Sequence, residues 1–336
     1  MHGMNDLLEI ARALVHPGKG ILAADESTKS ADARLASYGI ATGEEMRRKE
    51  RDMLLSCPGL EEYLSGVILY DETLRQNGED GRPFGEILSS RGIIPGIKVD
   101  EGTEPAPESP DELITKGLLG LPERLTEYRE QFGTGFTKWR AVVKIDGDRL
   151  PTRQVMVENA KRLAEYSALV QKAGMVPMVE PEVLLEGNHS RMRSRQVLEE
   201  TLSVLVEALE NHAVDMSGVI LKTAMAISGS TSGRTDTPEE VAEDTVGALM
   251  NVMPRGLAGV VFLSGGQTPD QATDNLRAIE REAKAKNAPW PMTFSYSRAL
   301  QDEALRAWAG KDENVEVARE AYMKRLKSVY QAAKGE

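Results

Sequence analysis

A lysine directly behind an apolar run is the first sign of chemistry in this sequence. Lys222 follows residues 219–221, a Val-Ile-Leu run that is typical of a strand buried on both faces. Burial disfavours the charged ammonium and lowers the pKa of a lysine, and a neutral amine can add to a carbonyl group. This pattern indicates a Schiff-base enzyme. A lysine at a strand end can also reach solvent along its own stem, so the other residues must decide.

Charged side chains also interrupt the ends of other apolar runs. They are Asp25, Glu26, Lys98, Asp100, Lys138, Arg140, Lys144, Glu180 and Glu182. Residues two apart on a strand share one face, so Lys138 and Arg140 point the same way, as do Glu180 and Glu182. If these groups converge, neighbouring cations keep the Lys222 amine neutral by repulsion. A carboxylate can then relay protons while a carbinolamine forms and collapses.

Two further groups of residues indicate anion binding. One group follows two late apolar runs and contains Ser264, Gly265, Gly266, Ser295, Ser297 and Arg298. Glycine N–H groups and a helix N-terminus can cradle a phosphate, and an arginine adds a bidentate fork. The second group lies near two earlier runs and contains Ser27, Ser30, Arg34 and Lys98. Two anion sites beside a lysine nucleophile suggest a bisphosphorylated substrate.

The elements that must position these residues repeat along the chain. Eight short apolar runs occupy residues 20–25, 66–72, 93–100, 135–145, 174–183, 218–225, 259–266 and 291–297. The segments with helical periodicity between them are 31–55, 73–89, 109–131, 151–172, 190–211, 238–253, 269–285 and 299–333. Eight strand and helix repeats predict parallel strands closed into a (β/α)8 TIM barrel, an α/β fold with its active site at the C-terminal strand ends.

The remaining segments fit one domain spanning residues 1–336. We expect a short helix at 4–15 before the barrel and C-terminal helices at about 299–333. The Pro-rich patch 103–112 is interpreted as a loop between a strand and a helix. No shift in composition divides the chain.

Composition excludes several classes of function. A net charge of -12 argues against nucleic acid or an anionic membrane as the main partner. No apolar run approaches the roughly 20 residues that span a bilayer, and the N-terminus lacks a signal-peptide pattern, so a cytoplasmic protein is expected. The single cysteine, Cys57, excludes an internal disulfide, and four histidines make a metal site with three histidine ligands improbable.

Seven motifs resemble, in order and separation, those of class I fructose-1,6-bisphosphate aldolases. They are residues 18–28, 96–100, 138–145, 179–184, 218–222, 262–267 and 293–300. The resemblance implies a TIM barrel that reversibly cleaves fructose 1,6-bisphosphate to dihydroxyacetone phosphate and glyceraldehyde 3-phosphate, in glycolysis and gluconeogenesis. It implies no metal or other cofactor, and usually a homotetramer.

The resemblance also implies roles for individual residues. Lys222 resembles the Schiff-base lysine, and Glu180 resembles the carboxyl group that serves as acid and base. Asp25 matches the aspartate that handles the C4 hydroxyl proton, Lys138 a lysine that supports carbinolamine chemistry, and Glu182 a second acid. The C1-phosphate cradle is matched by Ser264, Gly265, Gly266, Ser295 and Arg298. The other phosphate is matched by Ser27, Ser30, Arg34 and Lys98, with Arg47 and Arg140 as further basic residues near the substrate.

Departures from the family pattern leave the substrate preference open. Ala33 and Glu101 stand where many relatives have lysine, and Ser297 stands where they have glycine. The chain stops at Glu336, without the long tail whose final tyrosine assists proton transfer in the animal enzymes. The alternatives are the same chemistry on fructose 1-phosphate or sedoheptulose 1,7-bisphosphate, and a non-catalytic sensor or scaffold. The last is disfavoured because an inactive descendant is expected to lose catalytic residues that this chain retains.

Overall fold

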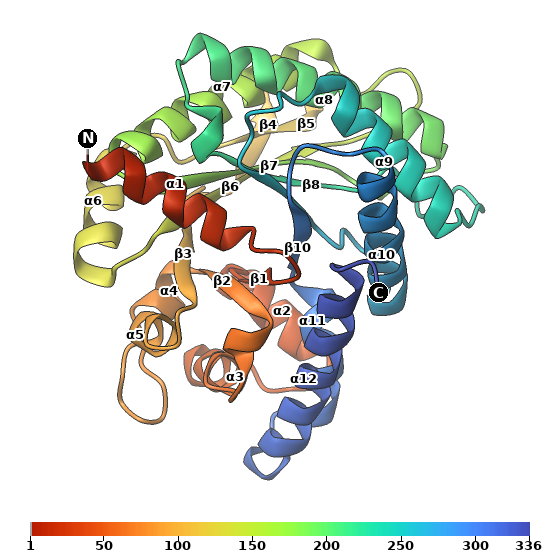
Figure 1. Ribbon diagram of the computed structural model, residues 1–336. Coiled ribbons are helices and arrows are strands. Elements are labelled where there is room, and N and C mark those ends of the chain that lie inside the picture. Colours follow the sequence, from red (N-terminus) through yellow and green to blue (C-terminus); the bar gives the residue numbers. More distant parts are fainter. Residues whose placement is uncertain (1) are drawn as a thin grey trace.

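Eight parallel strands close into a barrel that helices surround (Figure 1). The computed structural model describes residues 2–336, with side chains described from Leu7 onward. The barrel strands are β1 (Gly20–Ala24), β2 (Leu64–Leu69), β3 (Ile94–Lys98), β6 (Phe136–Val143), β7 (Val176–Val183), β8 (Ile220–Thr223), β9 (Gly259–Phe262) and β10 (Met292–Tyr296). Each lies within or overlaps one of the predicted apolar runs, so the prediction of a (β/α)8 TIM barrel is confirmed.

The helices form the outer layer and the loops between them carry function. They are α1 (His2–Leu14), α2 (Thr28–Ser37), α3 (Glu44–Leu55), α4 (Asp71–Leu74), α5 (Phe84–Ser89), α6 (Leu121–Phe132), α7 (Arg153–Lys172), α8 (Arg191–Asn211), α9 (Pro238–Val252), α10 (Pro269–Ala285), α11 (Arg298–Trp308) and α12 (Val315–Ala332). Hydroxyl caps start several of them. Thr237 and Glu240 form a reciprocal capping box at α9, which satisfies N–H groups that have no partner inside the helix. In the described part of the chain, no helix is long and apolar enough to span a bilayer.

Helix α1 closes the N-terminal end of the barrel. Its residues pack with inward-facing strand residues such as Phe136 and Ile220 in one buried apolar cluster. The contact is close because glycines begin the neighbouring strands: a Cβ atom at Gly218 would collide with the Leu7 side chain, and one at Gly259 would lie 2.8 Å from Val15. The opposite, C-terminal end is therefore the one left for a functional cavity.

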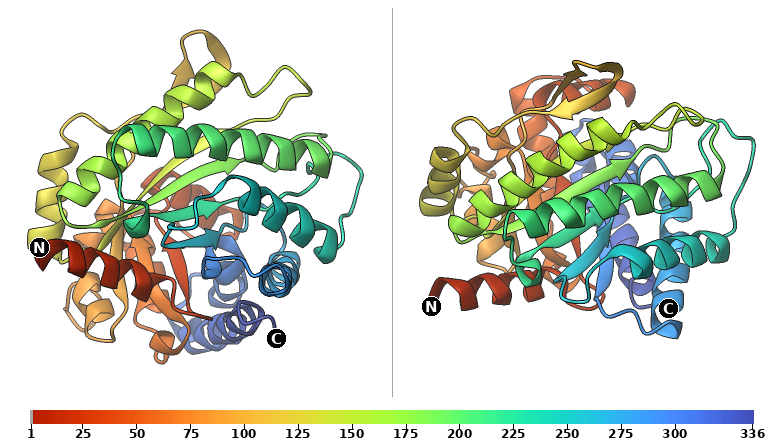
Figure 2. Two further views of the ribbon diagram at one scale, coloured as in Figure 1. Left: turned by 45° about the horizontal axis from the view of Figure 1, so that its top comes forward. Right: turned by 90° about the horizontal axis from the view of Figure 1, so that it is seen from above.

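The predicted loop at 103–112 is wrong. These residues belong to an antiparallel hairpin of β4 (Thr103–Ala106) and β5 (Ser109–Thr115), which lies beside α7 at the edge of the molecule (Figure 2). Tertiary contacts overrode the proline content, because the Asn159 side chain of α7 accepts from the Thr115 N–H and donates to the Leu113 carbonyl. The helix predicted at 109–131 accordingly begins only at Leu121, after Gly120 in a left-handed conformation.

Three predicted connectors are each divided into two helices. The segment 31–55 contains α2 and α3, separated by Gly39 and Gly43 with φ of 70° and 117°. Segment 73–89 contains α4 and α5, and 299–333 contains α11 and α12, where Gly310 has φ of 73°. Periodicity alone joined them because apolar residues recur on both sides of each break.

Candidate active site

A cavity of about 990 Å³ lies at the C-terminal ends of the strands. Its lining comes from strand ends and from the loops that follow them. The predicted residues that line it are Asp25, Ser27, Ser30, Lys98, Lys138, Arg140, Glu180, Glu182, Lys222, Ser264, Gly265, Ser295, Ser297 and Arg298. The barrel topology thus brings together residues up to 273 positions apart in the chain, from Asp25 to Arg298.

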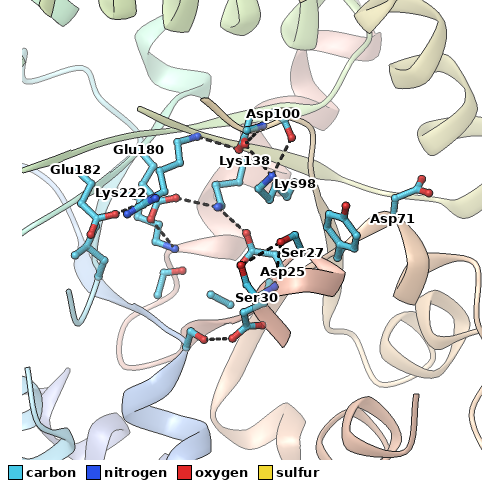
Figure 3. Close-up of a pocket in the computed structure, with 18 of the residues that line it drawn as sticks. Asp25, Ser27, Ser30, Asp71, Lys98, Asp100, Lys138, Glu180, Glu182 and Lys222 are labelled. Atoms are coloured by element: carbon cyan, nitrogen blue, oxygen red, sulfur yellow. Dashed lines mark hydrogen bonds and ion pairs between the residues drawn. The ribbon is translucent and has the colours of Figure 1, made fainter. Parts of the chain in front are cut away.

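Lys222 extends from β8 into this cavity and is only 3% exposed. The alternative in which the lysine reaches bulk solvent is therefore wrong. Its Nζ lies 3.1 Å from Glu180 Oε1 (Figure 3). Both cations and carboxylates were expected around the amine, and the group in direct contact with it is a carboxylate. An amine beside a buried carboxylate has a partner to which it can pass a proton.

Lys138 of β6 joins two carboxylates in the centre of the cavity. Its Nζ lies 2.6 Å from Asp25 Oδ2 and 3.1 Å from Glu180 Oε2 (Figure 3). Together with the Lys222 contact, these ion pairs form one buried chain that runs from Lys222 through Glu180 and Lys138 to Asp25. All four side chains are nearly inaccessible to solvent, so their mutual interactions are weakly screened.

Burial and charge act in opposite directions on these groups. Burial raises the pKa of Asp25 and of Glu180, but the positive charges of Lys138 and Lys222 outweigh burial and leave each pKa below its ordinary value. Burial lowers the pKa of Lys138, but the carboxylates of Asp25 and Glu180 outweigh it, so that the pKa lies above its ordinary value. At neutral pH both acids are therefore ionised and Lys138 is protonated.

Asp100 organises the next layer of the cavity wall. It is 8% exposed, its Oδ1 lies 2.8 Å from Lys98 Nζ, and its Oδ2 accepts from the Arg140 N–H at 3.3 Å. The Arg140 guanidinium in turn forms an ion pair with Glu182. Lys138 and Arg140 of β6 both line the cavity, as do Glu180 and Glu182 of β7, in agreement with the predicted alternation. Lys98 and Arg140 thus each form an ion pair with a carboxylate of the cavity wall.

The loops after β9 and β10 form a concave backbone site. Gly265 and Gly266 have φ of 51° and 90°, conformations that residues with a Cβ atom rarely adopt. A Cβ atom at Gly266 would lie 3.9 Å from Arg298 Nη2, so the arginine stands beside this turn. The Ser295 hydroxyl is buried and has no hydrogen-bond partner among the described residues. This arrangement suits an anion, since it combines a glycine turn, an arginine and a hydroxyl.

Two basic residues and one glycine expected at the site do not line the cavity. Arg34 points away, and its guanidinium contacts Glu26 and Asp302, both at 2.8 Å. Arg47 is held by Glu72 at 2.6 Å and by Asp32 at 2.8 Å. Gly266 lies just behind the lining. The sequence marked Glu26 as a charged residue at a strand end, but it did not show that these arginines pair with carboxylates, because the pairs form between different elements of the fold. Ser27 and Ser30 do reach the cavity, at the N-terminus of α2, with their hydroxyls 3.1 Å apart.

One wall of the cavity was missed. It consists of helix residues, in which Tyr128 donates to Asp71 at 2.9 Å and Arg75 pairs with Glu127 at 2.7 Å. Asp71 lies two residues after the end of β2 and could have been found by the rule used for the other strand ends. The residues of α6 carried no such signal. Across the described chain, no group of three or more histidine, cysteine, aspartate or glutamate residues is arranged to hold a metal ion.

Comparison with known proteins agrees with this geometry. Residues 6–336 match the family model described as fructose-bisphosphate aldolase class-I. The fructose-bisphosphate aldolase of Drosophila melanogaster is 46% identical over 98% of this chain and 91% of its own length. The Arabidopsis thaliana relative named fructose-bisphosphate aldolase 6, cytosolic, is 44% identical over 98% and 91%.

A solved structure extends the likeness to the fold. It is a fructose-bisphosphate aldolase from Plasmodium falciparum in complex with TRAP and a small molecule inhibitor. The two chains share 40% identity and a TM-score of 0.96, over 100% of this chain and 96% of the other. Family model, relatives and structure cover nearly every residue that builds the barrel and its cavity. The chain therefore belongs to the class I fructose-bisphosphate aldolase family.

Proposed function

We propose that Lys222 is the amine through which this chain cleaves fructose 1,6-bisphosphate to dihydroxyacetone phosphate and glyceraldehyde 3-phosphate. The chain is a lyase of glycolysis by its family, which uses a lysine Schiff base and no metal cofactor. The observation that carries the assignment is the buried contact between Lys222 and Glu180, which provides both a nucleophile and its proton partner.

The first steps form the Schiff base. Lys222 passes a proton to Glu180, 3.1 Å away, and the neutral amine attacks the C2 ketone of the open-chain sugar. The resulting carbinolamine loses its hydroxyl as water, with Glu180 returning the proton, and the nitrogen becomes a protonated imine. Lys138, held between Asp25 and Glu180, keeps its positive charge and stabilises oxyanion character at the carbinolamine.

The next steps break the carbon–carbon bond. Asp25 takes the C4 hydroxyl proton, the C3–C4 electron pair moves toward the iminium nitrogen, and the aldehyde leaves. The proton that Asp25 took is then delivered to C3 of the enamine, and water hydrolyses the resulting imine to release the second triose phosphate and the free Lys222 amine. Asp25 suits the role of base because it is ionised. Burial raises the pKa of its carboxyl, but the charges of Lys138 and Lys222 outweigh burial and lower it overall. Glu182, paired with Arg140, is the second acid of the site.

The two phosphates are assigned to opposite sides of the cavity. The loops after β9 and β10 hold the C1 phosphate through Ser264, Gly265, Gly266, Ser295 and Arg298. Ser27, Ser30 and Lys98 hold the other phosphate, with Arg140 nearby. Arg34 and Arg47 lie outside the cavity lining and are not assigned to either phosphate, because both are held in ion pairs with carboxylates. Anchoring both ends fixes the scissile bond against the catalytic groups.

Fructose 1-phosphate is a second candidate substrate. Arg34, expected at the second phosphate, and Arg47, expected near the substrate, do not line the cavity, and Lys98 is already paired with Asp100. The site for the C6 phosphate is thus less basic than the sequence suggested. The C6 phosphate gains less binding energy in such a site than in one with several free cations. A sugar without that phosphate is therefore at a smaller disadvantage in binding.

The setting of the enzyme is proposed from its relatives and its charge. We place it in the cytoplasm because the Arabidopsis relative is named cytosolic, and we propose a homotetramer by resemblance to the family. The net charge of -12 is unfavourable for nucleic acid or anionic lipid as a partner.

Reductive trapping tests the assignment of Lys222. Borohydride added with substrate should attach the triose phosphate irreversibly to Lys222, as peptide mapping would show, and EDTA should leave turnover unchanged. Lys222→Ala should abolish both trapping and cleavage. Lys144→Ala, at an exposed lysine just beyond β6, should change neither. Trapping on another lysine, or full loss of turnover in EDTA, would refute the scheme.

A further inference from the structure

Ser297 stands at the start of α11 but does not cap it. Its hydroxyl accepts no hydrogen bond from the first turn of the helix. The side chains that precede five other helices do accept one: Ser27, Thr152, Ser190, Thr237 and Thr268. The Ser297 hydroxyl instead donates to Glu26 Oε1 at 2.5 Å, between the C-terminal ends of the neighbouring strands β10 and β1. Because the hydroxyl bonds to a carboxylate of another element and not to its own helix, Ser297 does not function as an ordinary N-cap residue.

Glu26 is an ionised acceptor that collects donors from three directions. Arg34 Nη1 lies 2.8 Å from its Oε1, and Arg51 Nη2 lies 2.8 Å from its Oε2. Burial raises the pKa of Glu26, but the charges of Arg51 and Arg34 outweigh burial and lower it overall. Hydrogen bonds from a hydroxyl to a carboxylate are short and about twice as strong as neutral ones. The Ser297 bond is therefore a firm link to an immobile group.

This link begins where the backbone pairing of two strands ends. In the register of β1 and β10, the last pair is Leu22 with Tyr296. Beyond this last pair, the bond between Ser297 and Glu26 links the two chain segments through their side chains. Gln301 adds a second tie one turn into α11, because its Nε2 donates to the Ala23 carbonyl at 2.7 Å. The start of α11 is thus held in place against the end of β1.

The two ends joined in this way carry different parts of the site. Glu26 directly follows Asp25, which we assigned as the base, and Ser297 directly precedes Arg298, which we assigned to the C1-phosphate cradle. Because the Ser297 hydroxyl is turned to Glu26, it does not occupy the N-terminus of α11, where a phosphate is favoured. The donated proton also offsets the negative charge of Glu26, which would otherwise repel a phosphate bound nearby.

We propose that Ser297 is a positioning residue that fixes the C1-phosphate cradle to the end of β1 through Glu26. The inference rests on the proposed function, which supplies the phosphorylated substrate. It differs from direct phosphate contact, because the hydroxyl acts through a carboxylate. Loss of the Ser297 hydroxyl removes one tie that holds the start of α11. It also leaves the negative charge of Glu26 less well neutralised beside the cradle, and both effects weaken anion binding.

The test compares Ser297→Ala with Ser297→Thr, which keeps the hydroxyl. The measurements are kcat and KM for fructose 1,6-bisphosphate and the dissociation constant of inorganic phosphate by calorimetry. For Ser297→Ala we expect KM and the phosphate dissociation constant to rise by about three- to tenfold, with kcat within about twofold of wild type. Ser297→Thr should restore most of the affinity. The control Ser190→Ala removes a hydroxyl that does cap its helix, at α8, and should lower thermal stability without changing KM.

The outcomes separate this inference from the proposed function. Unchanged KM and phosphate affinity in Ser297→Ala would overturn it, and so would a fall in kcat alone, which would place the hydroxyl in the chemistry at Asp25. An equal loss of affinity in the threonine variant would also overturn it. If Ser297→Ala does not fold, Ser297→Cys replaces it, since a thiol is similar in shape but a weak donor. Failure of the wild type to be trapped on Lys222 would instead refute the proposed function.

Discussion

Lys138 and Asp25 form a buried ion pair in the cavity, with Nζ 2.6 Å from Oδ2. The same ammonium lies 3.1 Å from Glu180, so a single cation separates two carboxylates that would otherwise repel each other. The arrangement keeps both acids ionised and close to the reacting carbons. Replacing Lys138 therefore tests directly whether this shared cation holds the site together.

Lys138→Met should reduce kcat by about 100-fold or more, because two buried carboxylates lose their shared counterion and the carbinolamine loses its stabilising charge. The same variant should lose about 3–5 kcal/mol of unfolding free energy, as expected when one partner of a buried ion pair is removed. Steady-state kinetics and urea unfolding measure the two effects. Lys138→Arg keeps the charge and should retain more stability than the methionine variant. Equal stability in both variants would contradict this account.

Glu180→Gln should lower kcat by about 100- to 10,000-fold, since the amide can neither accept the proton of Lys222 nor return it. Borohydride trapping should slow in parallel. Glu186→Gln, at an exposed glutamate just beyond β7, serves as the matched control and should retain full activity. Wild-type trapping rates in Glu180→Gln would assign the proton transfers to another group.

The depressed pKa values of Asp25 and Glu180 predict how stability changes with pH. Burial raises both pKa values, but the charges of Lys138 and Lys222 outweigh burial and lower them overall. A carboxyl group with a depressed folded-state pKa stabilises the fold above its unfolded pKa of about 4, and that stability is lost as pH falls through the folded value. Unfolding free energy should therefore decrease below about pH 4, more steeply in wild type than in Asp25→Asn. Chemical unfolding at several pH values measures this. Identical slopes would show that Asp25 titrates normally.

Glu280 of α10 predicts the opposite dependence. Burial raises the pKa of its carboxyl to about 8, with Lys284 only partly opposing this. A raised folded-state pKa means stability that is complete below about pH 4.3 and is lost as pH rises toward 8. Glu280→Gln should thus be more stable than wild type at pH 8 and should lose less stability between pH 5 and 8. Thermal unfolding across this range measures the effect. Glu282→Gln, on the same helix with an exposed ion pair, should keep the wild-type slope.

Glu101 predicts a change in substrate preference. It lines the cavity, and its carboxylate is 3.8 Å from the Arg124 guanidinium, which leaves a negative charge on the side assigned to the C6 phosphate. Glu101→Lys should lower KM for fructose 1,6-bisphosphate by about two- to fivefold, the range of an exposed ion pair, and leave KM for fructose 1-phosphate unchanged. For Glu101→Gln, the KM for fructose 1,6-bisphosphate should lie between those of wild type and Glu101→Lys. An equal change for both sugars would show that Glu101 does not face the second phosphate.

Much of the fold could be predicted because barrel strands are buried on both faces and appear as apolar runs, as 219–221 does before Lys222. The hairpin of β4 and β5 could not, since its proline-containing strand depends on contacts with Asn159 of α7. Helix breaks near Gly39 and Gly310 were missed because periodicity continues across them.

The site was predictable where chemistry coincides with strand ends. Lys222, Glu180, Lys138 and Asp25 meet because alternation and barrel closure place them on the same side. Arg34 was not predictable in the same way: it lies near the site in sequence, but its pairing with Glu26 after β1 and with Asp302 of α11 is a tertiary contact. Which cation remains available for a ligand depends on such pairings, and these appear only in three dimensions.

The packing of α1 against the N-terminal strand ends has a consequence for traffic through the enzyme. With Leu7 and Val15 fitted against Gly218 and Gly259, that end offers no passage for a sugar phosphate. Hexose entry, departure of both trioses and exchange of the water made and consumed at Lys222 must share one opening. In the proposed scheme the second triose is still bound to Lys222 when the aldehyde forms, so we expect the aldehyde to leave first through this opening.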